Sequence, residues 1–301
     1  MQSLSNAFVH CIDTILYNQA STMNGCLTET MKTPSSAPRT SAESKSQRRL
    51  PRVRAVPAVT RAIAILRLLG NSATPLGLKA IAQSLDLVPS TCLHILRALI
   101  EEKLVKVNAY SKRYSLDLGM LPLARAVLEN SSFATLVQPE LDRLSKQYGL
   151  TAIGVEMLGL EYMIVVALSR SPARLGLHVV VGSRFPALIS ASGRCVAAFG
   201  HHPWSHVAQR FRSLRWDNAP KLGVWRKEVE SVKRNGYSID RSNYINGVTI
   251  IAAPVLDANQ HMAQGIVLLG LAEQINKSAA IAIAQDLRAA AQTVAMQLFS
   301  H

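Results

Sequence analysis

The stretch from Leu78 to Tyr114 constrains the fold of this chain most, because its pattern predicts two short helices, a tight turn between them and a basic hairpin. Apolar residues recur at i, i+3, i+4 and i+7 from Leu78, and this first helix is expected to end near Asp86. A second helix is expected to begin at Pro89–Ser90. The segments LVKV and RYSL alternate as short strands do, with a turn at residues 108–112 between them. This order of elements predicts a winged helix-turn-helix.

Apolar stripes indicate how these helices pack. In the second helix, one face carries an apolar stripe formed by Cys92, Leu96 and Leu99, with Ile95 and Ile100 at its edges. Upstream of the motif, a further helix is expected to pack through Val59, Ala62, Ile63, Leu66 and Leu69, and to end at Gly70-Asn71.

The opposite face of the second helix is small, hydroxylic or basic, and it suits entry into a DNA major groove. Its residues are expected to face bases or nearby phosphates: Ser90, Thr91, His94 and Arg97. Arg61, Lys112 and Arg113 are expected to hold the DNA backbone. The alternative is a plain helical hairpin whose polar face is only solvated. The tight spacing together with the basic hairpin favours DNA binding.

The distribution of charge points the same way. The chain of 301 residues has a net charge of +14, and residues 51–120 carry 10 Lys/Arg against 4 Asp/Glu. Residues 121–301 carry 18 against 12, so 70 residues hold the same excess of +6 as the following 181. A density of this kind favours a polyanionic partner such as double-stranded DNA over a general role in solubility.

The remaining composition excludes several classes of protein. The four cysteines, Cys11, Cys26, Cys92 and Cys195, have no CxxC spacing, so neither a zinc site nor a disulfide framework is expected, and the chain fits a reducing cytoplasm. No apolar run reaches the length of a membrane helix, and no motif indicates a metal or a cofactor. Residues 1–55 are interpreted as a disordered basic extension without the basic start of a signal peptide, and Met31 is a possible translation start.

The rest of the chain predicts a second, α+β domain. A winged helix-turn-helix at 56–118 and a linker helix at 119–132 are expected to precede an effector-binding and oligomerisation domain at 133–301. There a helix from Leu136 to Tyr148 is expected, followed by strands at TAIGVEML, EYMIVVALS and HVVV. Helices are expected at about 193–199, 203–213 and 221–235, then strands at GYSID, VTIIAAPVL and AQGIVLLG and a long C-terminal helix. This pattern indicates a sheet with one exposed face or a pocket.

Three segments within residues 56–299 resemble the IclR family of bacterial transcription regulators. They are the helix-turn-helix from Val59 to Val107, the stretch FPALISASGRCVAA, and NGYSIDRSNYINGVTIIAAPVLD, which is similar to the family's most specific signature. The resemblance implies dimers or tetramers and a GAF/PAS-like C-terminal α/β domain that binds a small organic acid.

The resemblance also implies where such an acid would bind. The N–H groups of Ala191, Ser192 and Gly193 would hold its carboxylate, with Arg194 beside them, and Asp240 matches the signature acid. Sheet positions that often carry Cys or Ser in the family are aliphatic here: Ile250, Val267 and Leu269. The departure favours an aromatic or longer-chain acid over glyoxylate or pyruvate. The alternative is that these residues only cap a helix and fill a core.

Two other functions are alternatives to a ligand-responsive regulator. An enzyme could use Cys195, whose thiol pKa would fall at a helix start, together with His178, His201 or His202. No motif connects these residues, so no catalytic residue is assigned. A nucleoid-type protein that binds DNA without a ligand is the other alternative, and the large sheet domain argues against it.

Overall fold

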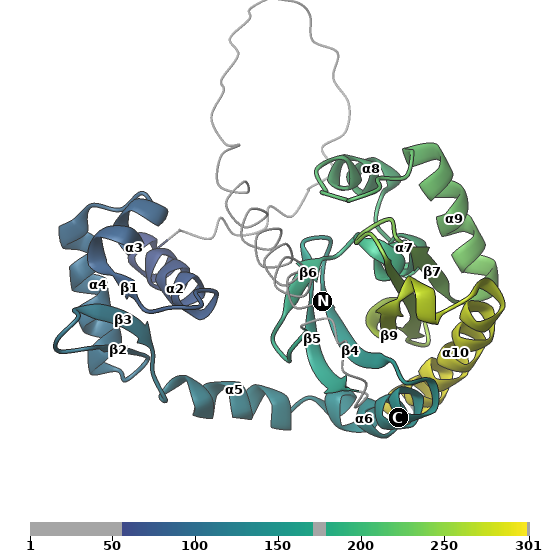
Figure 1. Cartoon of the computed structure of the whole chain (residues 1–301), viewed down its shortest axis with the longest axis horizontal. Helices are drawn as coiled ribbons and strands as arrows, with labels where there is room; N and C mark the ends of the chain where they lie inside the picture. Colours follow the sequence, from purple (N-terminus) through teal and green to yellow (C-terminus); the bar gives the residue numbers. More distant parts are fainter. Residues whose placement is uncertain (1–55, 171–178, 300–301) are drawn as a thin grey trace, which may run out of the picture. The chain divides into compact units, whose positions relative to one another are not determined.

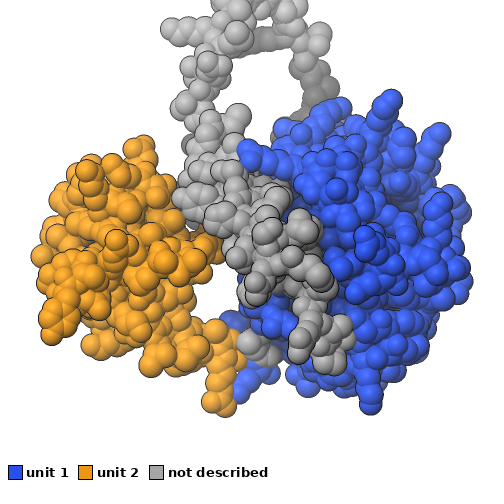
Figure 2. All heavy atoms as spheres, in the orientation of Figure 1, with its two compact units in different colours: residues 1–19, 127–301 blue, residues 20–126 orange. Residues whose placement is uncertain are grey.

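The computed structural model describes residues 56–170 and 179–299, so the predicted basic extension at 1–55 lies outside the described residues (Figure 1). The chain forms two compact units that divide between Ala126 and Val127 (Figure 2). Helix α5 (Met120–Glu129) crosses this division, within the region predicted as a linker helix. In the described part of the chain, no helix is long and apolar enough to cross a membrane.

The first unit is a winged helix-turn-helix, as predicted. Its helices are α2 (Pro57–Gly70), α3 (Leu78–Ser84) and α4 (Pro89–Glu101). The wing consists of β2 (Val105–Val107) and β3 (Arg113–Leu116), which pair as an antiparallel hairpin. The sequence did not predict β1 (Leu76–Gly77), which pairs with β3 and makes the sheet order β1-β3-β2, because a two-residue strand has no recognisable alternation.

The core of this unit confirms the stripe predicted for α4 and corrects the one predicted for α2. Cys92, Leu96 and Leu99 are buried. In α2, however, Ile65 is buried with Leu69, whereas Val59 is 59% and Ile63 is 42% exposed. The helix carries apolar residues on more than one face, so periodicity alone could not choose the side that packs on α3 and α4.

The second unit is built around a six-stranded antiparallel sheet with the order β6-β5-β4-β9-β8-β7. Its strands are β4 (Thr151–Leu158), β5 (Tyr162–Ser169), β6 (Arg184–Pro186), β7 (Ser238–Arg241), β8 (Val248–Leu256) and β9 (Met262–Leu271). Its helices are α6 (Ser132–Tyr148), α7 (Ser190–Phe199), α8 (Trp204–Arg212), α9 (Leu222–Asn235) and α10 (Lys277–Phe299), with the short 3-10 helix η2 (Ala272–Gln274) after β9.

Helices cover both faces of this sheet, so of the two predicted alternatives, an exposed face or a pocket, the described structure has the pocket. Alternate residues of β9 point to opposite sides, as strand geometry requires. Ile266 and Leu268 pack with α6 and α10, while Val267 and Leu269 belong to the core shared with α7, α8 and α9. In Figure 1, α6 and α10 lie together, and Arg143 of α6 donates hydrogen bonds to Asp286 of α10 at 2.9 and 3.0 Å.

Two predicted elements of this unit differ in the structure. Helix α6 begins at Ser132 rather than Leu136, since the hydroxyl of Ser131 accepts a hydrogen bond from the Ala134 N–H and caps the helix. The segment HVVV is not a strand at residues 179–181, and its first residue lies outside the described part of the chain. The strand on that side is β6 instead, which pairs with β5 through Phe185 and Met163.

Candidate DNA-binding surface and effector pocket

The polar face of α4 points to solvent in the described structure. Ser90, His94 and Arg97 are exposed and Thr91 is partly exposed, on the side opposite the buried stripe of this helix. The four residues predicted to read DNA therefore share one accessible face.

The three residues predicted to hold the DNA backbone are exposed as well. Arg61 lies on α2, Lys112 lies in the β2–β3 turn and Arg113 begins β3. One nitrogen of the Arg113 guanidinium, Nη1, donates a hydrogen bond to the Pro75 carbonyl at 3.1 Å. This bond orients the guanidinium, which has further N–H donors for a phosphate.

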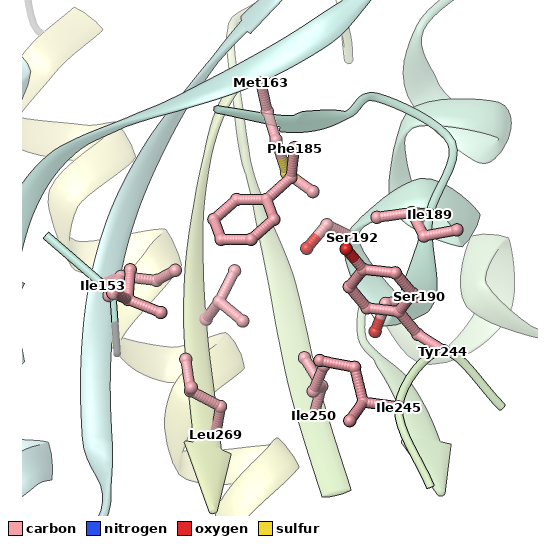
Figure 3. Close-up of a pocket in the computed structure, with 12 residues that line it drawn as sticks. Ile153, Met163, Phe185, Ile189, Ser190, Ser192, Tyr244, Ile245, Ile250 and Leu269 are labelled. Carbon is pink, nitrogen blue, oxygen red and sulfur yellow. The ribbon is translucent and has the colours of Figure 1, made fainter. Parts of the chain in front are cut away.

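A pocket in the second unit lies between the sheet and the start of α7 (Figure 3). It encloses about 580 Å³, counting open space at its mouth. Twelve described residues line it, and none of them is charged: Ile153, Met163, Val179, Phe185, Ile189, Ser190, Ser192, Tyr244, Ile245, Ile250, Val267 and Leu269. An apolar lining with a few hydroxyl groups is typical of sites for small organic molecules.

The sheet side of the pocket is formed by cross-strand pairs. Ile153 of β4 lies opposite Val267 of β9, and Ile250 of β8 lies opposite Leu269 of β9. Antiparallel pairing places such residues on the same face of the sheet. The three aliphatic residues predicted from the sequence thus lie together on this wall, and the strand register explains why.

The polar groups of the pocket come from α7 and from the loop after β7. In Figure 3 the hydroxyl groups of Ser190, Ser192 and Tyr244 lie on one side, and Ile153 and Leu269 lie on the other. The Ser190 hydroxyl is buried and has no hydrogen-bond partner among the described residues. Burial and, to a smaller extent, the negative charge of Asp217 raise the pKa of the Tyr244 phenol. The phenol therefore stays protonated and can donate a hydrogen bond.

The sequence prediction missed Ser190 and Tyr244. Helix α7 begins at Ser190, not near residue 193, and Ser190 has a positive φ of 58°. A non-glycine residue in this region of backbone space is uncommon, and such strain concentrates at functional sites. The run ISASG contains no signal for it, because serine is an ordinary residue at a helix start.

The remaining predicted effector residues do not line the pocket. The N–H of Gly193 is used within the helix, where it donates to the Ile189 carbonyl at 2.8 Å. A Cβ at position 193 would stand 2.0 Å from the carbonyl carbon of Leu188, so this glycine allows α7 to approach the preceding chain. Ala191 is buried in the adjoining core.

Arg194 and Asp240 are also outside the pocket lining, which corrects their expected position beside a carboxylate. Both side chains are buried, and Arg194 Nη1 lies 3.2 Å from Asp240 Oδ2. Arg194 Nε donates to Glu228 on α9 at 2.7 Å, and Nη2 donates to Asn243 Oδ1 at 3.1 Å. A guanidinium with these partners is neutralised within the fold and is not offered to a ligand.

This buried charge cluster connects the two elements that carry the pocket hydroxyls. Arg194 Nη1 donates to the Ser190 carbonyl at 2.9 Å, at the strained start of α7. Asp240 Oδ1 accepts from the N–H groups of Asn243 at 2.9 Å and Tyr244 at 3.4 Å. Arg194 and Asp240 therefore support the walls of the pocket from behind.

Cys195 does not have the environment of a nucleophile. Its side chain is fully buried, its Sγ lies 3.7 Å from the Ala252 carbonyl oxygen, and burial raises the pKa of the thiol to about 12. The lowered pKa that the enzyme alternative needed is not found, because desolvation outweighs the attraction of Arg194. His178 lies outside the described residues, and within them no group of three or more His, Cys, Asp or Glu could hold a metal ion.

A thiol with this pKa is expected to be unreactive. In a Cys11→Ser, Cys26→Ser variant of the full chain at pH 8, neither Cys92 nor Cys195 should react rapidly with an aromatic disulfide reagent, because both are buried and protonated. Both should react after denaturation. Absorbance of the released thiolate measures the reaction, and a fast thiol that peptide mapping assigns to Cys195 in the native variant would contradict this account.

A winged helix-turn-helix with exposed basic residues is typical of DNA-binding transcription regulators. The chain belongs to the IclR family. Residues 58–109 match the family's helix-turn-helix domain, and residues 125–296 match the C-terminal domain of the bacterial transcriptional regulator IclR. It is therefore a DNA-binding transcriptional regulator with an effector-binding C-terminal domain, as the sequence resemblance implied.

Individual relatives agree with this assignment. The glycerol operon regulatory protein of Streptomyces griseus is 29% identical over 216 residues, which cover 71% of this chain and 84% of that protein. An IclR transcriptional regulator from Alicyclobacillus acidocaldarius has a similar structure, with a TM-score of 0.72, 24% identity and coverage of 80% and 98% of the two chains. An IclR homolog from Microbacterium hydrocarbonoxydans, complexed with 4-hydroxybenzoate, has a TM-score of 0.64 and 15% identity, covering 80% and 99%.

Proposed function

We propose that this regulator senses a small aromatic or longer-chain carboxylate in the pocket between the sheet and α7. The observation that carries the proposal is the division of the pocket into an apolar wall and a hydroxyl-bearing side. An amphiphilic monocarboxylate matches both sides. A small hydrated acid would leave most of the apolar wall without a partner.

The carboxylate end is assigned to the start of α7. The first N–H groups of a helix have no partner within it and carry partial positive charge. The buried Ser190 hydroxyl without a partner adds a donor there, as does the protonated Tyr244 phenol. Since Arg194 is held by Asp240 and Glu228, neutral donors supply the recognition, which suits one carboxylate and not two.

The apolar end of the ligand is assigned to the sheet wall formed by Ile153, Ile250, Val267 and Leu269. These side chains offer only dispersion and hydrophobic contact, which favours an arene or an alkyl chain. The homolog from Microbacterium hydrocarbonoxydans binds 4-hydroxybenzoate, an aromatic carboxylate of this class.

The other half of the function is the response of the DNA-binding unit. Ser90, Thr91, His94 and Arg97 are proposed to face bases, and Arg61, Lys112 and Arg113 to hold phosphates. Self-association is proposed as well, supported by the exposed Leu121, Leu123 and Val127 on α5. The effector changes DNA affinity only to the extent that it binds one arrangement of the DNA-binding units in the oligomer better than another.

Ligand preference tests the pocket directly. In isothermal titration calorimetry, benzoate, phenylacetate or octanoate is expected to bind more tightly than glyoxylate or pyruvate, because only the larger acids cover the apolar wall. Val267→Ser should weaken the best of these ligands roughly tenfold, the cost of replacing apolar contact with an unmatched hydroxyl. Tighter binding of glyoxylate than of every larger acid would contradict the proposal.

The matched control is Val224→Ser, which makes the same change at an exposed position of α9 outside the pocket. It should leave ligand affinity unchanged. A gel-shift titration on the DNA upstream of the gene, with and without the best ligand, then tests regulation. Binding that ignores both DNA sequence and ligand would indicate a nucleoid-type protein instead.

A further inference from the structure

The tip of the wing exposes an aromatic ring that the fold does not use. Tyr110 lies in the turn between β2 and β3 and is 97% exposed, whereas Leu118, the next most exposed of the described large apolar residues, is 72% exposed. A ring this exposed adds nothing to the core of the winged helix. The ring can contribute binding energy only through a partner molecule that covers it.

The turn that carries Tyr110 is held in a defined shape. The side-chain oxygen of Asn108 accepts hydrogen bonds from the N–H groups of Tyr110 at 3.0 Å and Ser111 at 2.9 Å. Asn108 and Arg113 continue the hairpin, with the Asn108 N–H donating to the Arg113 carbonyl at 2.9 Å. The backbone below the ring is therefore ordered before binding, which lowers the entropic cost of a contact.

The surroundings of the ring are basic. Lys112 and Arg113 are exposed beside it, and Lys106 lies on the neighbouring strand. The acid that follows β3, Asp117, lies at the other end of the hairpin, where its N–H donates to the Leu104 carbonyl and its carboxylate is 3.9 Å from Lys106. An exposed ring among basic side chains fits a partner with regularly spaced negative charge beside apolar surface. Duplex DNA is such a partner, because it presents phosphates together with sugar and base edges.

We propose that Tyr110 is a DNA-contacting residue, whose ring packs against the sugars and base edges of a groove while the adjacent basic residues lie on the phosphates. The contact adds affinity through the apolar surface of the ring and not through charge. It differs from the contacts of α4, because it depends on the shape of the groove more than on hydrogen bonds to bases. The proposal holds whether or not the pocket binds a carboxylate.

The test uses the full chain and fluorescence anisotropy on a duplex from upstream of its gene, at several salt concentrations without added ligand. Tyr110→Ala is expected to weaken binding roughly five- to thirty-fold, with the slope of log affinity against log salt unchanged. Tyr110→Phe should keep most of the affinity, because the ring remains. A second duplex of equal length and unrelated sequence should show a similar loss.

Lys112→Asn is the matched control on the same turn, since asparagine tolerates the positive φ of 51° at this position. It should reduce the magnitude of the salt slope by about 0.9, the signature of one lost phosphate contact. Unchanged affinity of Tyr110→Ala overturns the proposal. So does a loss in Tyr110→Phe as large as in Tyr110→Ala, which would assign the contact to the hydroxyl, or a change of oligomeric state in Tyr110→Ala without a change in DNA affinity.

Discussion

Replacing Gly193 by alanine is expected to lower the free energy of unfolding of the C-terminal unit by about 3 kcal/mol or more. The new Cβ would stand 2.0 Å from the Leu188 carbonyl carbon and 2.1 Å from its oxygen. These are backbone atoms that cannot turn away as a flexible side chain can, so α7 itself must shift. Chemical denaturation followed by circular dichroism measures the change.

The control for this prediction is Gly223→Ala, in the first turn of α9. A Cβ there meets nothing within 4 Å, and the same substitution is expected to be neutral or to stabilise the helix by up to about 1 kcal/mol. Since α7 carries Ser190 and Ser192, Gly193→Ala should also abolish binding of any pocket ligand. Equal stabilities for the two variants would show that the close approach of α7 to Leu188 is not required.

The second large effect is expected for Asp240→Ala, which removes the buried partner of Arg194. An uncompensated buried charge typically costs about 3–5 kcal/mol, and the remaining ion pair with Glu228 places this variant near the lower end of that range. Asp240→Ala also removes the acceptor for the N–H groups of Asn243 and Tyr244, so the loop that carries the Tyr244 phenol should loosen. Denaturation and ligand titration measure the two effects.

Glu228→Ala provides the comparison within the same cluster. Its side chain is 41% exposed, so water can replace it beside Arg194, and the expected loss of stability is about 1 kcal/mol or less. Asp240→Asn separates the two roles of Asp240, because it keeps a side-chain oxygen for the loop and removes the charge. If Glu228→Ala cost as much as Asp240→Ala, the ion pair with Asp240 would not be the main support of Arg194.

Much of the fold followed from local sequence patterns. The strand predicted at TAIGVEML coincides with β4, and the long C-terminal helix coincides with α10. Gly149 and Gly236 end α6 and α9 in the left-handed conformation that glycine adopts most easily, which is why those ends were predictable. Apolar periodicity failed to give the packed side of α2, because apolar residues lie on more than one face of that helix.

The pocket was only partly predictable, for a related reason. Ile250, Val267 and Leu269 line it, as the resemblance to the family implied, and the pairing of β8 with β9 puts them on one face of the sheet. Ser190 and Tyr244 could not be found in this way. Their places depend on the positive φ at the start of α7 and on the hydrogen bonds from the loop to Asp240.

The sequence by itself determined the winged helix-turn-helix, the exposed polar face of α4 and the family, because each depends on residues close together in the chain and on their periodicity. Only the tertiary structure decided what Arg194 and Asp240 do. Both occur in motifs that suggested contact with a carboxylate, yet 46 positions separate two groups that lie 3.2 Å apart and neutralise each other. Whether a charged side chain faces a ligand or a partner within the fold depends on long-range packing, because the cost of burying a charge is settled by whatever group lies beside it.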